Sequence, residues 1–329
     1  MDLLSRLLAL MPVAGQLDAR CHFGAPWRID GAAAGEREIH YHVLLSGEAS
    51  FEDGLGEPLV MQAGDIVMLP SGVGHVLHDG SGKRPAKSEE RFVAGLEMVS
   101  NKGRGAPADV LCGRFLLPAM PQQLLRDHLP NRLLVRTSAA PGQDAAAGNR
   151  LTRLVGLMRE ESDELGPGSL ALVNHLSGAL FALTMRFASE AGEPPRGLLA
   201  LAARPRLQPA LSAMFDTPEK AWTLPELAEL CHMSRATFAR HFDEAIGRSA
   251  SDMLTEIRMT IAGRMLAEGK LSVAEIGERV GYQSDAAFQR VFKRQIGVTP
   301  AQWRAQSRER VELAEVGEAR VKCLHEAAS

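Results

Sequence analysis

An internal repeat in the last third of the chain constrains the fold more than any other feature of the sequence. The segment LPELAELCHMSRATFARHFDEAIG begins at Leu224, and a second copy, VAEIGERVGYQSDAAFQRVFKRQIG, begins at Val273. The aligned positions are Leu227 with Ile276, Cys231 with Val280, Met233 with Tyr282, Phe238 with Phe288, Arg240 with Arg290 and Phe242 with Phe292. Such self-similarity predicts two copies of one small structural unit.

Each copy has the pattern of a helix-turn-helix. A short apolar helix is followed by a turn, which contains Gly281 in the second copy, and Ser234 and Ser284 stand where a second helix needs its N-cap. The phenylalanines of each second helix share one face, because residues three or four apart are neighbours on a helix. The residues expected to face DNA are Arg235, Ala236, Thr237 and Arg240 in the first copy and Ala286, Gln289, Arg290 and Lys293 in the second.

These outward residues suit the major groove of double-stranded DNA. Arginine binds guanine and glutamine binds adenine through paired hydrogen bonds, and small side chains contact thymine methyl groups. The intervening segment SDMLTEIRMTIAGRMLAEG predicts a helix of about five turns, which would hold the two reading helices about one duplex turn apart. The net charge of −3 gives no sign of nucleic-acid binding, so any basic surface is local. Two hairpins that merely pack together would account for one copy, but not for a matched pair.

The stretch 206–308 resembles the AraC-type DNA-binding domain. The second copy and its continuation, VAEIGERVGYQSDAAFQRVFKRQIGVTPAQWR, carry most of the likeness. The resemblance implies that the family's two base-reading arginines fall on Arg240 and Arg290. Ala236 departs from the family, whose members often have a larger contacting side chain there, which implies weaker readout by the first unit.

Residues 20–117 have the pattern of a β domain. Segments such as IHYHVLL, DIVMLP and RFVAGLEMV are separated by Gly, Pro and Asp turns, which indicates a sandwich or a barrel. The run GDIVMLPSGVGH, ending at His75, is similar to the second cupin motif, and HYH at 40–42 with Glu48 resembles a loosened first motif. The resemblance implies a cupin-like barrel of the kind found in front of AraC-type domains.

Three histidines are the candidate effector residues of this barrel. His40 and His42 share a strand face because side chains alternate, and the barrel would bring His75 beside them. Three histidines with open positions suit Zn²⁺ or Fe²⁺, although the sequence makes no cofactor certain. A metal-free pocket for an organic effector and purely structural, hydrogen-bonded histidines are the alternatives.

The four cysteines, Cys21, Cys112, Cys231 and Cys323, are widely separated, and no pair has CxxC spacing. Reduced thiols in the cytoplasm are therefore expected. Cys21, which precedes His22, and Cys112 are candidate redox residues, because a neighbouring histidine can lower the pKa of a thiol. Buried, inert cysteine is the alternative, and it is the interpretation for Cys231.

Helical patterns occupy the rest of the chain. The leucines near the N-terminus recur at helical spacing, which favours a short amphipathic helix over an export signal, and no apolar run reaches the length of a membrane span. LTRLVGLMREESDEL and LALVNHLSGALFALTMRFASEAG predict two further helices, with a loop at 138–149 and a joint at 192–197. The candidate dimerisation residues of the second helix are Leu176, Leu180, Leu183 and Phe187.

The predicted fold is a multidomain α+β chain with an N-terminal cupin-like β-barrel, a helical middle region and a C-terminal all-α double helix-turn-helix domain. The expected boundaries are a sensor domain at 1–120, a helical linker and dimerisation region at 121–205, a DNA-binding domain at 206–308 with units at about 224–245 and 273–296, and a charged tail at 309–329.

This organisation predicts a cytoplasmic transcription regulator rather than an enzyme. A signal in the barrel, carried by a small molecule, a metal or an oxidant, would alter how the C-terminal domain engages promoter DNA or RNA polymerase. The resemblance implies a homodimer, and no membrane partner is expected. Two rival functions are a constitutive DNA binder whose barrel only dimerises, and a metal-dependent cupin enzyme fused to a DNA-binding module.

Overall fold

The computed structural model describes residues 2–10, 12–118, 129–137, 145–190, 197, 200–201 and 203–309. The chain divides into two compact units, which are treated separately below. The barrel unit comprises residues 1–118 and 125–205, and the helical unit comprises residues 119–124 and 206–329. Most of the expected joint at 192–197, half of the expected loop at 138–149 and nearly all of the expected tail at 309–329 lie outside the described residues.

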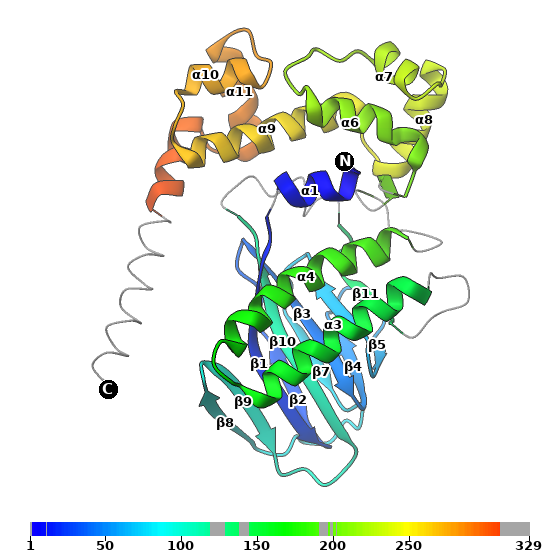
Figure 1. Cartoon of the computed structure of the whole chain (residues 1–329), viewed down its shortest axis with the longest axis vertical. Coiled ribbons are helices and arrows are strands. Elements are labelled where there is room, and N and C mark those ends of the chain that lie inside the picture. Colours follow the sequence, from blue (N-terminus) through cyan, green and yellow to red (C-terminus); the bar gives the residue numbers. More distant parts are fainter. Residues whose placement is uncertain are drawn as a thin grey trace. The chain divides into compact units, whose positions relative to one another are not determined.

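Two β-sheets form the body of the barrel unit (Figure 1). One sheet has seven strands in the order β11-β6-β3-β10-β1-β9-β8, and the other has four in the order β2-β7-β4-β5. The strands are β1 (Ala14–Gly24), β2 (Arg28–Gly31), β3 (Glu38–Ser46), β4 (Glu48–Glu52), β5 (Leu59–Gln62), β6 (Ile66–Leu69), β7 (His75–His78), β8 (Ser88–Val93), β9 (Leu96–Asn101), β10 (Pro107–Leu116) and β11 (Leu133–Val135).

Strand alternation gives the seven-stranded sheet two different faces. On β3, His42 and Leu44 point between the sheets, where Leu44 joins a core that includes Phe51 and Leu77 of the smaller sheet. The neighbouring Tyr41 points to the other face, which is covered by helices. This period of two therefore separates the interior of the barrel from the surface on which the helices pack.

Three described helices accompany the strands of the barrel unit: α1 (Leu3–Leu10), α3 (Ala145–Glu164) and α4 (Ser169–Ser189). The Tyr41 hydroxyl shares a 2.8 Å hydrogen bond with Ser177 of α4, and Phe115 of β10 packs edge-on against Phe181. A Cβ atom on Gly15 of β1 would overlap the backbone of Gly178, so this glycine permits α4 to approach the sheet closely.

Part of the helical prediction for 121–205 is wrong, because Leu133–Val135 forms the edge strand β11. The strand pairs with β6 through the register Leu133↔Met68 and Val135↔Ile66, and both of its end residues are buried. A segment of three residues is too short to show a periodicity of its own, and its extended conformation is stabilised by pairing with the edge of β6. The helices α3 and α4 match the other two patterns of this region.

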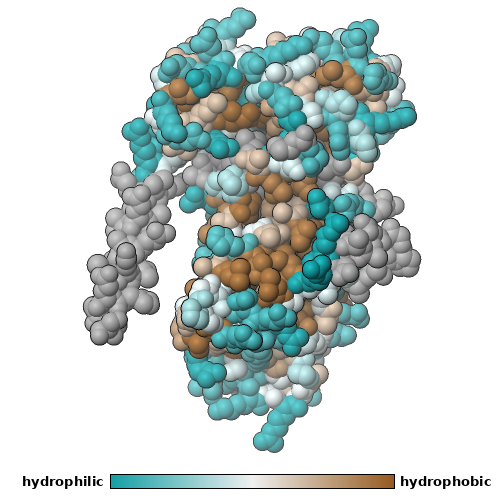
Figure 2. Space-filling view, in the orientation of Figure 1, coloured by the Kyte–Doolittle hydropathy of each residue, from teal (hydrophilic) through white to brown (hydrophobic). Residues whose placement is uncertain are grey.

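The apolar stripe of α4 divides between core and surface. Leu180 and Phe187 are buried in the barrel unit, whereas Leu176 and Leu183 are half-buried and Leu172 is 40% exposed. Figure 2 shows apolar side chains gathered over the outer face of this helix. By length and composition alone α4 could cross a membrane, but its inner face belongs to the core of the barrel unit.

The helical unit consists of η1 (Pro205–Leu207), α6 (Gln208–Asp216), α7 (Leu224–Leu230), α8 (Arg235–Ile246), α9 (Ala250–Glu268), α10 (Val273–Arg279) and α11 (Asp285–Ile296), followed by a further helical segment at 300–309. The expected repeat is therefore present as the pairs α7–α8 and α10–α11, and α9 lies between them in sequence as one unbroken helix. A cluster that includes Ile276, Phe288 and Phe292 packs the second pair onto α9.

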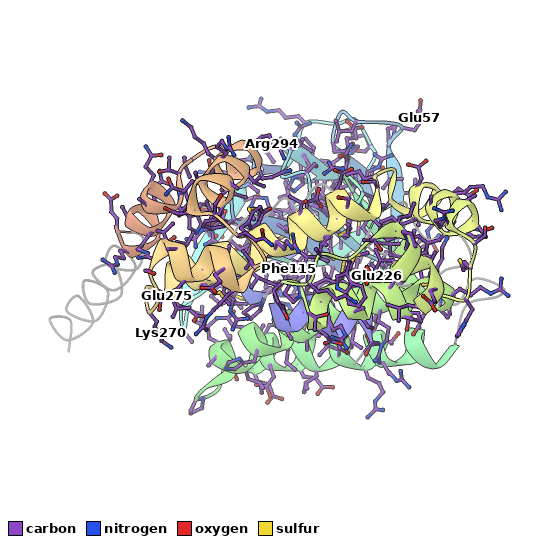
Figure 3. The ribbon with its side chains drawn as sticks, turned by 90° about the horizontal axis from the view of Figure 1, so that it is seen from above. Glu57, Phe115, Glu226, Lys270, Glu275 and Arg294 are labelled. Carbon is purple, nitrogen blue, oxygen red and sulfur yellow. The ribbon has the colours of Figure 1, made fainter. Side chains whose placement is uncertain are left out.

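Side chains cap the helices of both repeats as the sequence predicts. Ser234 and Ser284 accept hydrogen bonds from the backbone of the first turns of α8 and α11. The preceding helices begin with reciprocal capping boxes, in which Thr223 pairs with Glu226 and Ser272 with Glu275. The two glutamates are labelled in Figure 3. Both glutamates carry a lowered pKa because they accept hydrogen bonds from these caps.

The turn between the two helices of each repeat requires a left-handed backbone. In the second copy Gly281 supplies it with φ 86°, and in the first copy the aligned residue is His232, at φ 53°. A Cβ atom on Gly281 would overlap the carbonyl oxygen of Glu219 and lie 2.8 Å from the Arg258 guanidinium. The same turn is therefore unstrained in one copy and strained in the other.

We expect His232→Gly to raise the free energy of unfolding by about 1 kcal/mol, because glycine relieves the cost of left-handed backbone. Gly281→Ala should lower it by about 2 kcal/mol or more, through backbone strain and overlap together. Gly247→Ala is the control, because Gly247 has φ 72° but its Cβ would meet nothing within 4 Å. Urea unfolding measures all three, and a destabilised His232→Gly protein would contradict the assignment.

Candidate DNA-reading face and sensor cluster

The helices α8 and α11 each have one buried and one exposed face. Phe238 and Phe242 of α8, and Phe288 and Phe292 of α11, are fully buried. The candidate DNA-binding residues on the other faces are exposed, namely Arg235, Ala236, Arg240, Ala286, Gln289, Arg290 and Lys293. The amphipathic pattern of the sequence therefore placed these side chains on the surface of the helical unit.

Three of the candidate DNA-binding residues have local partners, and one of them is Arg240, which lies 3.9 Å from Glu244. Thr237 is half-buried, and its hydroxyl lies 2.9 Å from the Oγ of the capping Ser234. The Gln289 side chain donates a 2.8 Å hydrogen bond to Asp285, one turn earlier. Thr237 therefore helps to order the start of α8, and Gln289 must exchange Asp285 for a base before it can read DNA.

The connecting helix α9 is one helix of about five turns, as the sequence predicts. Its 19 residues span about 28 Å at the rise of an α-helix, close to the roughly 34 Å of one duplex turn. Capping by Ser249 and Asp252 at one end and by Gly269 at φ 71° at the other fixes where α9 begins and ends. The buried Glu256 forms an ion pair with Arg248, which ties the segment after α8 to α9.

A chain of four polar side chains crosses the interior of the barrel unit. Cys21 of β1 and Cys112 of β10 have sulfur atoms 4.0 Å apart. The Cys112 sulfur lies 3.1 Å from Nδ1 of His42, and Nε2 of His42 lies 2.6 Å from Nε2 of His75. The register Ala19↔Cys112 and Cys21↔Val110 makes the two cysteines diagonal neighbours on adjacent antiparallel strands.

The proton positions in this chain follow from its last member. Nδ1 of His75 lies 3.4 Å from the carbonyl oxygen of Val73, which can only accept, so this nitrogen carries hydrogen. Nε2 of His75 is then the acceptor for the Nε2–H of His42. Nδ1 of His42 is left without hydrogen and accepts the S–H of Cys112.

Burial keeps the chain uncharged. Burial, followed by the nearby His75 and His40, holds the pKa of His42 well below its usual range, and burial also lowers the pKa of His75. The hydrogen bond with Cys21, together with burial, holds the pKa of Cys112 well above that of an ordinary thiol. Neutral imidazoles and a protonated thiol are therefore the resting states near neutral pH.

The expected convergence of His42 and His75 is present, but the three histidines do not form a metal site. The His40 ring centre is 5.8 Å from that of His75, and two nitrogens 2.6 Å apart are closer than two ligands on one tetrahedral Zn²⁺. Among the described residues, no three His, Cys, Asp or Glu side chains are arranged to hold a metal ion. The geometry of the described residues does not fit Zn²⁺ or Fe²⁺.

The histidine that is adjacent to a candidate redox thiol in sequence is not the one that contacts a thiol in the structure. His22, adjacent to Cys21 in sequence, instead has Nδ1 3.4 Å from Asp109. The histidine that contacts a thiol is His42, distant in sequence, and the pKa of Cys112 is raised. The sequence signal that could have found this contact is the pairing of the two strands, because His42 lies directly opposite Cys112 in the β3–β10 register.

Two family models match the chain. A cupin model matches residues 2–190, and a helix-turn-helix domain model matches residues 227–306. The chain belongs to the AraC-type transcriptional regulators that carry an N-terminal cupin domain. Its C-terminal unit is the DNA-binding domain of that family, so double-stranded DNA is a partner.

Full-length relatives share this organisation. The RCS-specific HTH-type transcriptional activator RclR of Escherichia coli K12 is 30% identical, over 94% of this chain and 99% of the relative. An uncharacterized HTH-type transcriptional regulator of Haemophilus influenzae is 31% identical, over 92% of this chain and 98% of the relative.

The crystal structure of the DNA-binding domain of AdpA in complex with a target DNA matches at 33% identity, over 32% of this chain and 95% of that one, with a TM-score of 0.30.

Replacing Arg240 or Arg290 with alanine should weaken binding at the corresponding half-site by about 1–3 kcal/mol, because a guanidinium that reads a guanine is lost. Folding should be unchanged, since both side chains are exposed. Gel-shift titration at fixed salt on the native promoter measures the effect. Arg264→Ala on α9, where Arg264 pairs with Glu268, is the matched control. Wild-type affinity in both variants would remove these arginines from the interface.

Proposed function

We propose that this protein is an oxidant-responsive transcription regulator, in which the Cys21–Cys112 pair of the cupin domain is the sensor and the helical unit reads DNA. The observation that carries the proposal is the 4.0 Å separation of the two sulfur atoms inside the barrel. The relative RclR is described as an RCS-specific transcriptional activator. The protein is proposed to act in the cytoplasm and not to be an enzyme.

The sensing step is a two-electron oxidation. One thiol attacks the oxidant, and the second thiol then displaces the leaving group from that sulfur. An S–S bond forms, two S–H bonds break, and the oxidant takes up two electrons and both protons, as water when the oxidant is hydrogen peroxide. A disulfide has an S–S length of about 2.05 Å, so the sulfur atoms must approach by about 2 Å. The Cys112 thiol donates its hydrogen bond to Nδ1 of His42, and the low pKa of His42 together with the high pKa of Cys112 keeps the proton on sulfur until the thiol reacts.

A buried ion network connects the strands that carry the two cysteines to helix α3. Arg20, next to Cys21 on β1, binds Asp109 of β10 and also Asp163 of α3. Arg20 additionally donates hydrogen bonds to the Arg159 carbonyl and to Ser162. A change in the spacing of β1 and β10 would therefore act on the end of α3.

The outer face of α4 is proposed to join two copies of the chain. Leu172 is 40% exposed there, beside the half-buried Leu176 and Leu183. An exposed apolar surface of this kind marks an interaction site. A dimer would bind two copies of a bipartite DNA site. Bound at a promoter, it would lie close enough to contact RNA polymerase.

The double variant Leu172→Glu with Leu176→Glu should be monomeric in light scattering at micromolar concentration, because two charges would enter the apolar contact of each copy. Phe92→Glu on β8 is the control, since Phe92 is 75% exposed and lies on a different element. A wild-type protein that is monomeric with and without DNA would rule out this assembly.

Treatment with hypochlorous acid or hydrogen peroxide should join Cys21 to Cys112 and change DNA affinity or reporter activity. Cys21→Ser and Cys112→Ser should each prevent the disulfide, because each removes one of the two sulfur atoms. Each variant should also lower reporter induction by oxidant at least about tenfold. Peptide mapping by mass spectrometry and a promoter reporter measure the two effects.

Cys231→Ser is the control, because Cys231 caps α7 in the helical unit and should leave the response intact. Full induction of the Cys112→Ser protein would overturn the redox proposal. DNA binding that is insensitive to oxidant and to any effector would favour the constitutive binder, and turnover of a substrate would favour the enzyme.

A further inference from the structure

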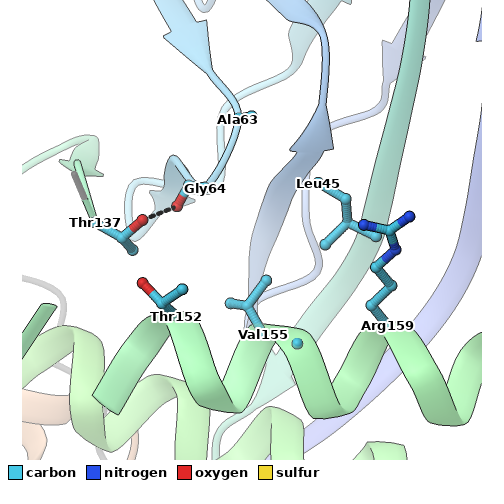
Figure 4. A pocket seen from close by; sticks show the side chains of 8 residues that line it. Leu45, Ala63, Gly64, Thr137, Thr152, Val155 and Arg159 are labelled. Atoms are coloured by element: carbon cyan, nitrogen blue, oxygen red, sulfur yellow. Dashed lines mark hydrogen bonds between the residues drawn. The ribbon is translucent and has the colours of Figure 1, made fainter. Parts of the chain in front are cut away.

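A cavity of about 400 Å³ lies between α3 and the ends of the β-strands of the barrel unit (Figure 4). It is separate from the Cys–His chain, which lies between the sheets. Leu45 of β3, Gly64 in the turn before β6 and Thr137 after β11 line it from the strands, and Thr152, Val155 and Arg159 line it from α3. The Thr137 hydroxyl donates a 3.0 Å hydrogen bond to the Gly64 carbonyl and so closes one wall.

The lining of the cavity combines one cationic side chain with polar and apolar surface. Arg159 is the cationic lining residue, and within the described part of the chain no acidic side chain lines the space. Figure 4 shows the Thr152 hydroxyl directed into the cavity, with Val155 and Leu45 supplying apolar surface. The hydroxyl and the guanidinium lie at opposite ends of the space, with the apolar side chains between them, and a mixed lining of this kind suits a small molecule.

The Arg159 guanidinium is weakly engaged within the described part of the chain. Its ion pair with Asp163 has an N–O distance of 4.0 Å, at the limit for such a contact. Asp163 is committed to the buried Arg20, at 2.9 Å. Arg159 can therefore bind an incoming anion without breaking a strong interaction.

Gly156 is a second observation that points to a ligand in the cavity. Glycine inside a helix is destabilising relative to alanine, yet Gly156 lies in the middle of α3. A Cβ atom there would meet nothing within 4 Å, so close packing does not require glycine. Any larger side chain at this position would instead project into the cavity, since Gly156 is one of its lining residues.

We infer that this cavity binds a small organic anion, whose acidic group contacts Arg159 and whose apolar body lies on Val155 and Leu45. An acidic group drawn to Arg159 also competes with Asp163, a member of the network that anchors Arg20. The anion would thereby act on the same end of α3 as the proposed redox sensor. The binding itself does not depend on the cysteines or on the proposed redox function.

Cyclohexanecarboxylate is a suitable probe, and isothermal titration of the full chain measures its binding. Saturable binding is expected for the wild type, with at least about tenfold weaker binding of cyclohexylmethanol, which has no charge, and of acetate, which has no apolar body. Cys21→Ser should bind the probe like wild type, which separates this site from the redox proposal.

Arg159→Gln and Gly156→Leu should each reduce probe affinity at least about tenfold, the first by removing the cation and the second by filling the space. Gly156→Leu should also raise the melting temperature, because leucine is the better helix former, so loss of binding would not reflect misfolding. Arg153→Gln, an exposed arginine of α3 outside the lining, is the matched control. No saturable binding to wild type, equal binding of the alcohol, or unchanged affinity in Arg159→Gln would each overturn the inference.

Discussion

The barrel unit depends on one buried arginine. Arg20 is 1% exposed, and its guanidinium joins β1 and β10 to the last turn of α3 through Asp109, Ser162, Asp163 and a backbone carbonyl. Removing one partner from a buried charge of this kind destabilises by about 3–5 kcal/mol, because the remaining charge is left without compensation. The strands that hold the two facing cysteines and the helix that forms the anion cavity are therefore parts of one mechanical arrangement.

The Cys–His chain is uncharged, in contrast to the ion network of Arg20, although its first member, Cys21, is the next residue in the sequence. Its members avoid charge through a sequence of donors and acceptors that ends on the Val73 carbonyl. Oxidation removes the S–H that begins this sequence. A two-electron event thus leaves Nδ1 of His42 without its donor in a buried site, where an unsatisfied polar group is costly.

The two DNA-reading helices share a backbone plan but differ in charge. In α8, Arg235 and Arg240 are offset by Asp243 and Glu244, and Arg240 lies within 3.9 Å of Glu244. In α11, Arg290, Lys293 and Arg294 (Figure 3) stand against the single acid Asp285. The second reading helix therefore presents more positive charge for phosphate binding than the first.

The sequence alone determined the parts of this protein that depend on local periodicity. The repeat, its serine caps, the exposed arginines and the long connector all follow from helical spacing, and the faces of β3 follow from a period of two. The short strand β11 could not be found in this way, because its partner β6 lies far away in sequence and three residues hold too little pattern.

Only the tertiary structure decided the chemistry of the barrel. Sequence adjacency pointed to His22 as the partner of a thiol, whereas strand register put His42 opposite Cys112 and brought Cys21 to 4.0 Å. Alternation could place His40 and His42 on one face, but not the distances that distinguish a hydrogen-bonded pair from a metal site. Spacing along a chain fixes which face a side chain takes, while the packing of distant strands fixes which atoms meet and whether they carry charge.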